Sequence, residues 1–98
     1  MGLSVSLHRR AEADLKSILD YITQQAGGRA AERVRSDIMR KLHTLSMAPW
    51  MGVASSRSIR ILQPTRYPYR IYYTVQGDQI VVLHVRHTAR QAPDDLGS

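Results

Sequence analysis

Four basic side chains near the end of the chain have the types and spacing to bind an anion: Arg70, Arg86, His87 and Arg90. Guanidinium groups in a fixed array suit phosphate oxygens, through paired hydrogen bonds, and they equally suit the carboxylates of an acidic peptide. Taken singly, these arginines could instead cap strand ends or pair with acids of the C-terminal tail. As a group, we interpret them as a contact site for a nucleic acid or an acidic protein.

A predicted β-hairpin from Tyr67 to Arg90 positions this basic cluster. Gly77-Asp78 is a two-residue turn signal between two apolar, β-branched and aromatic runs. The turn sets the cross-strand pairs Val75 with Ile80, Tyr73 with Val82, Ile71 with His84, Thr74 with Val81, Tyr72 with Leu83, and Arg70 with Val85. In this register Arg70 and His87 share one face at the open end of the hairpin, and Arg86 points to the other.

Two amphipathic helices precede the hairpin in this interpretation. The first runs from Ala11 to about Ala26, and the Gly27-Gly28 pair ends it. The second runs from about Arg29 to Ser46, and the short connection makes the two helices an antiparallel hairpin. Neither helix can bury its apolar stripe alone, so together they are expected to cover one face of a sheet.

Residues 3–8 and 58–63 are predicted strands, and residues 48–58 between the second helix and the second strand are predicted as a loop. Trp50 lies in that loop, and we expect it to tuck into the core. The order β-α-α-β-β-β defines an α+β fold, with a helical hairpin packed on a small, mainly antiparallel sheet of about four strands. One domain is expected over residues 3–90, followed by a polar tail at 91–98.

Composition narrows the classes of function. The 98-residue chain has a formal net charge of +6 and no cysteine, so disulfides and cysteine-bound metals are excluded. His84 and His87 are three residues apart on one strand and point to opposite faces, so no metal site is expected. Glycine-rich phosphate loops and nucleophile motifs are absent, and no cofactor is implied. The sequence shows neither a signal peptide nor an apolar run long enough to cross a bilayer, which favours the cytoplasm.

Two sequence patterns resemble the RelE/ParE superfamily of type II toxins from bacterial toxin–antitoxin modules. One is A-x-A-D-L-x-x-I-x-x-Y-I at residues 11–22. The other is YPYRIYYTV, then GDQIVVLHVRH, then Arg90. The resemblance covers about residues 3–90 and implies the same β-α-α-β-β-β order. RelE-like members cut mRNA in the ribosome, whereas ParE-like members lack that nuclease and poison DNA gyrase.

The resemblance matches Arg70 and Arg90 to two arginines of the nuclease members, but most of the other residues that those nucleases use are absent from this sequence. Thr88 and Ala89 stand where some relatives have a His-Tyr pair, and Leu96 where others have a tyrosine. The lysines on and before the second strand are also missing. Arg57 and Arg60 keep the charge there, but an arginine cannot act as a base at neutral pH.

The resemblance therefore favours a ParE-like toxin that poisons gyrase, without catalytic residues of its own. The expected target-binding residues are Arg60, Arg70, Arg86, His87 and Arg90. The expected partner is a cognate antitoxin with an acidic, partly disordered tail, bound in a hetero-oligomer at Leu15, Leu19, Ile22, Val34 and Ile38. The alternative is a ribosome-dependent mRNA endonuclease using Arg70, His87 and Arg90. A basic nucleic-acid-binding module ranks third, because it needs exposed aromatic side chains for stacking.

Overall fold

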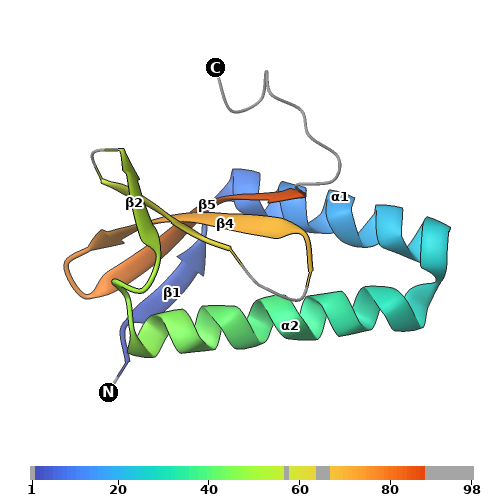
Figure 1. The fold of residues 1–98 in the computed structure, drawn as a ribbon, viewed down its shortest axis with the longest axis horizontal. Helices are drawn as coiled ribbons and strands as arrows, with labels where there is room; N and C mark the ends of the chain where they lie inside the picture. Colours follow the sequence, from blue (N-terminus) through green and yellow to red (C-terminus); the bar gives the residue numbers. More distant parts are fainter. Residues whose placement is uncertain (1, 57, 64–66, 88–98) are drawn as a thin grey trace.

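The computed structural model describes residues 2–56, 58–63 and 67–87, which form two helices and a five-stranded sheet (Figure 1). The elements are β1 (Ser4–Leu7), α1 (Arg9–Ala26), α2 (Gly28–Met47), β2 (Val53–Ser56), β3 (Ile59–Leu62), β4 (Tyr69–Gln76) and β5 (Gln79–His87). The strand order is β1-β5-β4-β3-β2, with β1 parallel to β5 and the other pairs antiparallel. The predicted α+β class is confirmed. The predicted count of about four strands is wrong, because β2 lies inside the segment that the sequence indicated as a loop.

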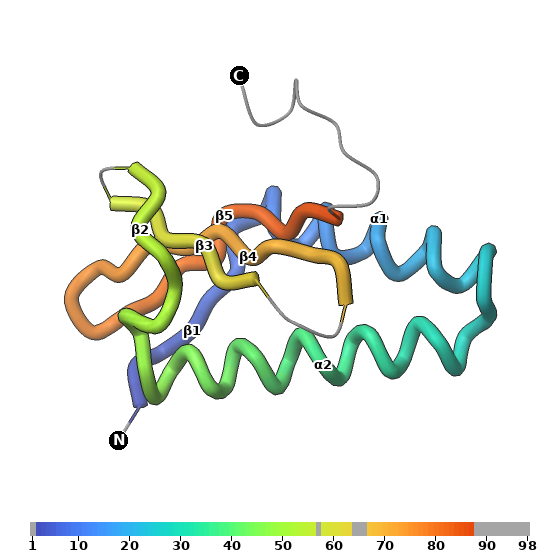
Figure 2. Tube along the Cα trace, viewed as in Figure 1, coloured from blue at the N-terminus to red at the C-terminus, as the bar shows by residue number. Residues whose placement is uncertain are grey.

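The helical hairpin forms much as its sequence predicts. Figure 2 shows α1 and α2 running antiparallel on either side of a tight turn. Gly27 makes that turn with φ of 94°, a conformation that side chains rarely adopt, and α2 already begins at Gly28. Helix α1 begins at Arg9, two residues earlier than predicted. The reason is an N-cap at His8, whose Nδ1 accepts the N–H of Arg10 at 3.1 Å.

The core lies between the helical hairpin and one face of the sheet. Alternate residues of β4 are fully buried there, namely Tyr69, Ile71 and Tyr73. They pack in one cluster with Ala11, Ile18, Val34, Ile38, Leu42 and Leu45 from the helices and with Ile80, Val82 and Val85 from β5. Because strand side chains alternate between faces, Arg70 and Tyr72 lie on the opposite face, which we call the open face.

The β4–β5 hairpin follows the predicted register only near its turn. Gly77 has φ of 63° and Asp78 does not have a positive φ, the pattern of a type II′ turn. Leu83 is then an extra residue on β5, a β-bulge, so the register shifts between Tyr73 and Tyr72. The cross-strand pairs beyond the bulge are Tyr72 with His84, Ile71 with Val85, Arg70 with Arg86, and Tyr69 with His87.

The loop between α2 and β2 is fixed by a buried tyrosine. The Tyr73 hydroxyl donates to the carbonyl of Pro49 and accepts the N–H of Gly52, both at 2.9 Å. Trp50 is 63% exposed, so the expected tuck into the core is wrong. Its ring instead packs against Arg60, whose guanidinium carbon lies 4.9 Å from the ring centroid.

Candidate functional site

The bulge in β5 assembles a basic site on the open face. Beyond the bulge Arg70 lies directly across from Arg86, and Tyr72 lies across from His84, with 6.4 Å between the ring centroids. All four side chains are half-buried. We call Arg70, Tyr72, His84 and Arg86 the open-face cluster. Like charges directly opposite on a ladder repel each other, so the pair of arginines needs a nearby anion.

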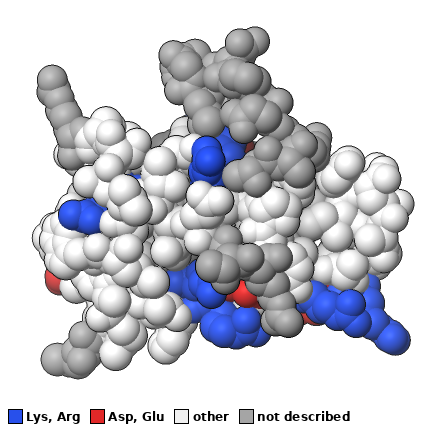
Figure 3. Space-filling model, in the orientation of Figure 1, with Lys and Arg blue, Asp and Glu red and all other residues white. Residues whose placement is uncertain are grey.

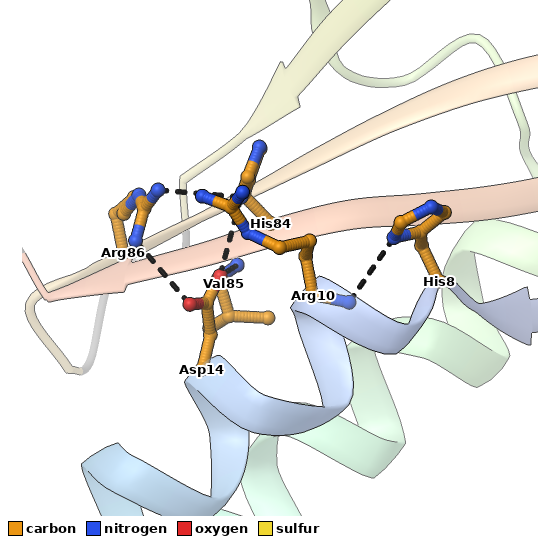
Figure 4. A network of polar contacts seen from close by, with 6 residues as sticks. All are labelled: His8, Arg10, Asp14, His84, Val85 and Arg86. Atoms are coloured by element: carbon orange, nitrogen blue, oxygen red, sulfur yellow. Dashed lines mark hydrogen bonds and ion pairs between the residues drawn. The ribbon is translucent and has the colours of Figure 1, made fainter. Parts of the chain in front are cut away.

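Asp14 of α1 supplies that anion for Arg86 (Figure 4). Its Oδ1 accepts from Nη1 of Arg86 at 3.3 Å, and its Oδ2 accepts the backbone N–H of Val85 at 3.1 Å. The strand β1 pairs with β5 only as far as Val82, so the edge of β5 is open beyond that point. The single carboxylate of Asp14 therefore both accepts a backbone N–H at the open edge of β5 and neutralises Arg86.

His84 lies between the anion and one of the cations of this site. Its Nδ1 is 3.3 Å from Nη2 of Arg86 and 3.4 Å from Oδ2 of Asp14. The tautomer with its proton on Nε2 accepts from Arg86 at Nδ1, and the tautomer with its proton on Nδ1 donates to Asp14. In either tautomer Nδ1 of His84 is therefore engaged within the cluster.

Arg70 is the cation that this network leaves available. Among the described residues, no acidic side chain pairs with it. It is half-buried and lies directly across from Arg86 in the β4–β5 ladder. The open-face cluster can therefore bind one external anionic group at Arg70.

The structure separates the other predicted target-binding residues from Arg70. His87 pairs with Tyr69 on the core-facing side, where its ring lies 5.9 Å from Tyr69 and 6.3 Å from Tyr21 between centroids. The prediction that Arg70 and His87 share a face is therefore wrong, and so is the prediction that Arg86 faces away from Arg70. The bulge at Leu83 is the reason for both, since one extra residue reverses the faces.

Arg60 lies on the core-facing side of the sheet, paired with Tyr73 in the β3–β4 ladder. Its Nη1 donates to the carbonyls of Trp50 at 3.2 Å and Gly52 at 2.6 Å. Arg60 therefore holds the loop before β2 and is not part of the open-face cluster. Arg90 lies outside the described residues, as do Arg57, Thr88, Ala89 and Leu96.

The predicted antitoxin-binding residues divide into two groups. Val34 and Ile38 are 5% and 0% exposed, so their place is in the core and they are not a surface for direct contact. Leu15, Leu19 and Ile22 are partly buried. Leu15 and Leu19 line a shallow hollow of about 420 Å³ beside β1, the kind of surface that a partner could cover.

Three residues of the site, Asp14, Tyr72 and His84, were not among the predicted binding residues. A signal for Asp14 exists in the sequence. It falls three residues after Ala11 and four before Ile18, which are both buried, so it is a carboxylate on the apolar stripe of α1. A charged group in that position requires a partner. His84 carries no comparable signal, because its position depends on the bulge.

The two buried tyrosines, Tyr69 and Tyr73, make the fold less stable at alkaline pH. Burial, and then the charge of Asp37, raise the pKa of Tyr69 far above its usual value, and burial also raises that of Tyr73. The folded chain thus keeps protons that the unfolded chain releases above about pH 10, so the free energy of unfolding falls as the pH rises through that range.

We expect Tyr69→Phe to reduce this loss of stability at alkaline pH. The measurement is the difference between the urea midpoints at neutral and at alkaline pH. Tyr21→Phe, at an exposed position, is the control and should leave the slope unchanged.

Two further properties of the described residues bear on the class of protein. None of the helices among them is long and apolar enough to span a membrane. No group of three or more His, Asp or Glu side chains in the same part of the chain could hold a metal ion.

The fold is that of type II toxins. The structure resembles that of a chromosomal ParDE toxin–antitoxin system from P. aeruginosa, with 25% identity, a TM-score of 0.77, and coverage of 87% of this chain and 95% of that chain. It also resembles the RelBE2 toxin–antitoxin complex from Mycobacterium tuberculosis (19% identity, TM-score 0.66, 89% and 99% coverage). The isolated E. coli RelE toxin is similar as well (15% identity, TM-score 0.65, 97% and 94% coverage). The matches below 25% identity show the fold alone.

Residues 5–92 match the sequence model of the ParE toxin of the type II toxin–antitoxin system parDE. The chain belongs to this ParE toxin family, within the RelE/ParE superfamily. No curated protein matches the sequence.

Proposed function

We propose that this toxin arrests bacterial growth by poisoning DNA gyrase, and that it acts without a nuclease centre of its own. The proposal is supported by the ParE family match over residues 5–92. The observation that favours gyrase over mRNA is the separation of His87 from Arg70 by the sheet. RNA cleavage through the 2′-hydroxyl needs one group to accept a proton and another to donate one. His87, the proton-transfer group that a nuclease would use, thus lies on the face of the sheet opposite Arg70.

A ribosome-dependent mRNA endonuclease remains the second candidate, because His84 does lie on the open face with Arg70 and Arg86. Two arginines beside a histidine suit the charge of a phosphodiester transition state. Against this candidate, Nδ1 of His84 is bonded within the cluster and Arg86 is neutralised by Asp14. The third candidate, a nucleic-acid-binding module, finds less support, since Tyr69 and Tyr73 are fully buried and Tyr72 is half-buried. The exposed ring of Trp50 is packed against Arg60, outside the open-face cluster.

We also propose a cognate antitoxin as the obligatory partner. The similar structures from P. aeruginosa and M. tuberculosis are described as a toxin–antitoxin system and a toxin–antitoxin complex. An acidic antitoxin tail suits the formal charge of +6. The partly buried side chains of Leu15, Leu19 and Ile22 are the contacts proposed on α1. A gyrase-directed toxin and its antitoxin would act in the cytoplasm.

The test is expression of this chain alone in bacteria from a tightly controlled promoter. Shortly after induction, an SOS reporter measures DNA damage and mapped mRNA 5′ ends measure cleavage. We expect growth arrest and SOS induction with intact mRNA. Arg70→Ala should weaken the arrest if Arg70 binds the target, whereas Arg9→Ala, at an exposed position on α1, should not. Early mRNA cleavage without SOS induction would reject the gyrase proposal. Loss of that cleavage in His84→Ala would then support the nuclease.

A further inference from the structure

A group of exposed apolar side chains lies between the end of α2 and the edge strand β2, outside the open-face cluster. Four of the six large apolar side chains that are exposed among the described residues fall within residues 47–53. They are Met47, Trp50, Met51 and Val53, with exposed fractions between 45% and 74%. We call these four residues and Arg60, which packs against the Trp50 ring, the Trp50 surface. Single exposed apolar side chains are ordinary, but such a concentration is typical of a contact with a partner.

Hydrogen bonds hold the loop of the Trp50 surface in place without a partner. The side chains of Tyr73 and Arg60 form four hydrogen bonds with backbone groups of residues 49–52, at distances of 2.6 to 3.2 Å. Tyr73 is fully buried, so the loop is fixed to the core. A partner that binds here does not have to order the loop, and more of the contact energy remains as affinity.

The residue types of the Trp50 surface are those that dominate protein interfaces. Tryptophan and arginine are the commonest residues of high binding energy, and methionine is enriched in interfaces as well. The guanidinium carbon of Arg60 lies 4.9 Å from the centroid of the Trp50 ring. Within the described part of the chain no acidic side chain pairs with Arg60. A carboxylate of a partner would therefore complement this charge beside an apolar contact.

The charges near the Trp50 surface favour a different protein over a nucleic acid or a second copy of this chain. Residues 47–56 contain no Lys or Arg, whereas binding to a phosphate backbone relies on several cations. Figure 3 shows mostly uncharged side chains on the side where Figure 1 places β2, with Lys and Arg gathered along the lower edge. A second copy would bring together two chains of charge +6, which repel each other.

We propose that the toxin docks on its target enzyme through the Trp50 surface, with the indole of Trp50 in an apolar pocket of that enzyme and a carboxylate at the rim of the pocket on Arg60. The inference rests on the proposed function for the identity of the target, DNA gyrase. The sheet order favours the target over the antitoxin as the occupant. The antitoxin contacts proposed at Leu15 and Leu19 lie beside β1, at the opposite edge of the sheet from β2.

The experiment measures binding of the purified chain to purified gyrase holoenzyme by surface plasmon resonance. Trp50→Ala should weaken binding about tenfold or more, as the loss of a central interface tryptophan does, and Trp50→Phe should lose less. Val53→Asp, which places a charge within the apolar contact, should also weaken binding. Met39→Asp is the matched control, because it makes the same change of charge at an exposed apolar residue of α2, and it should bind as the parent does.

Circular dichroism and urea unfolding check that each variant is folded. If the parent binds gyrase and both Trp50→Ala and Val53→Asp bind it equally well, the docking inference is overturned and the proposed function stands. If the parent neither binds gyrase nor induces the SOS response, the proposed function and the inference fail together. A dimer of the parent in analytical ultracentrifugation that Trp50→Ala dissociates, with gyrase binding unchanged, would reassign the Trp50 surface to self-association.

Discussion

Asp14→Ala is expected to lower the free energy of unfolding by about 3 kcal/mol, because it removes the anion from a largely buried ion pair. The side chains of Asp14 and Arg86 are only 14% and 18% exposed. Without the carboxylate, Arg86 faces Arg70 with no counter-charge, and the N–H of Val85 loses its acceptor. A small domain has only about 5–15 kcal/mol of stability in total, so the loss is a large share.

Urea unfolding followed by circular dichroism measures this effect. Asp14→Asn should cost less than Asp14→Ala, because the amide oxygen can still accept from Val85. Asp20→Ala is the matched control on the same helix: Asp20 pairs with Lys16 at 3.0 Å, but its side chain is 62% exposed. Exposed pairs of this kind contribute about 0.3–0.5 kcal/mol. Equal losses for Asp14→Ala and Asp20→Ala would show that the buried network does not stabilise the fold.

The parts of the fold that local sequence determines were predictable. The apolar stripes of α1 and α2 repeat at the helical period, and Gly27 permits the turn between them. Gly77 likewise determines the hairpin turn and the register closest to it. In each case the physical cause lies within a few residues of the structure that it produces.

The arrangement of the site depends on one residue that the sequence does not mark. Leu83 forms the bulge, yet it is neither glycine nor proline, and its neighbours are apolar residues typical of a regular strand. A one-residue slip reverses every side chain beyond it. The predicted partnership of Arg70 with His87 therefore becomes one of Arg70 with Arg86 and His84. Of the predicted basic residues, Arg70 and Arg86 lie side by side, whereas His87 lies on the other face of the sheet.

The segment before β3 shows a second limit of local prediction. β2 is a short edge strand of small and polar residues, Val-Ala-Ser-Ser, with weak strand propensity, and its pairing with β3 gives it its structure. Trp50 is exposed because the loop is fixed by backbone hydrogen bonds to Tyr73 and Arg60 and does not need a buried ring. These contacts join residues far apart in sequence, so no local pattern indicates them.

The contact between Gly52 and Tyr73 gives the second large expected effect. A Cβ atom at position 52 would lie 2.5 Å from the hydroxyl oxygen of Tyr73 and 3.0 Å from the carbonyl oxygen of Ile61. The tyrosine is fully buried and the carbonyl is backbone, so neither can move easily. We expect Gly52→Ala to destabilise the fold by about 2–3 kcal/mol, as overpacking in a core does. Gly28→Ala is the control, since a Cβ there meets nothing within 4 Å.

Tyr73→Phe separates the hydrogen bonds from the packing. It leaves the N–H of Gly52 and the carbonyl of Pro49 unpaired, at a cost of about 1–3 kcal/mol. Tyr69→Phe is its matched comparison: the Tyr69 hydroxyl has no hydrogen-bond partner among the described residues, so its removal should be neutral or stabilising. In the double variant of Gly52→Ala and Tyr73→Phe the clash with the hydroxyl is gone, and the combined loss should be smaller than the sum. Strict additivity would mean that the glycine is required for a reason other than this close approach.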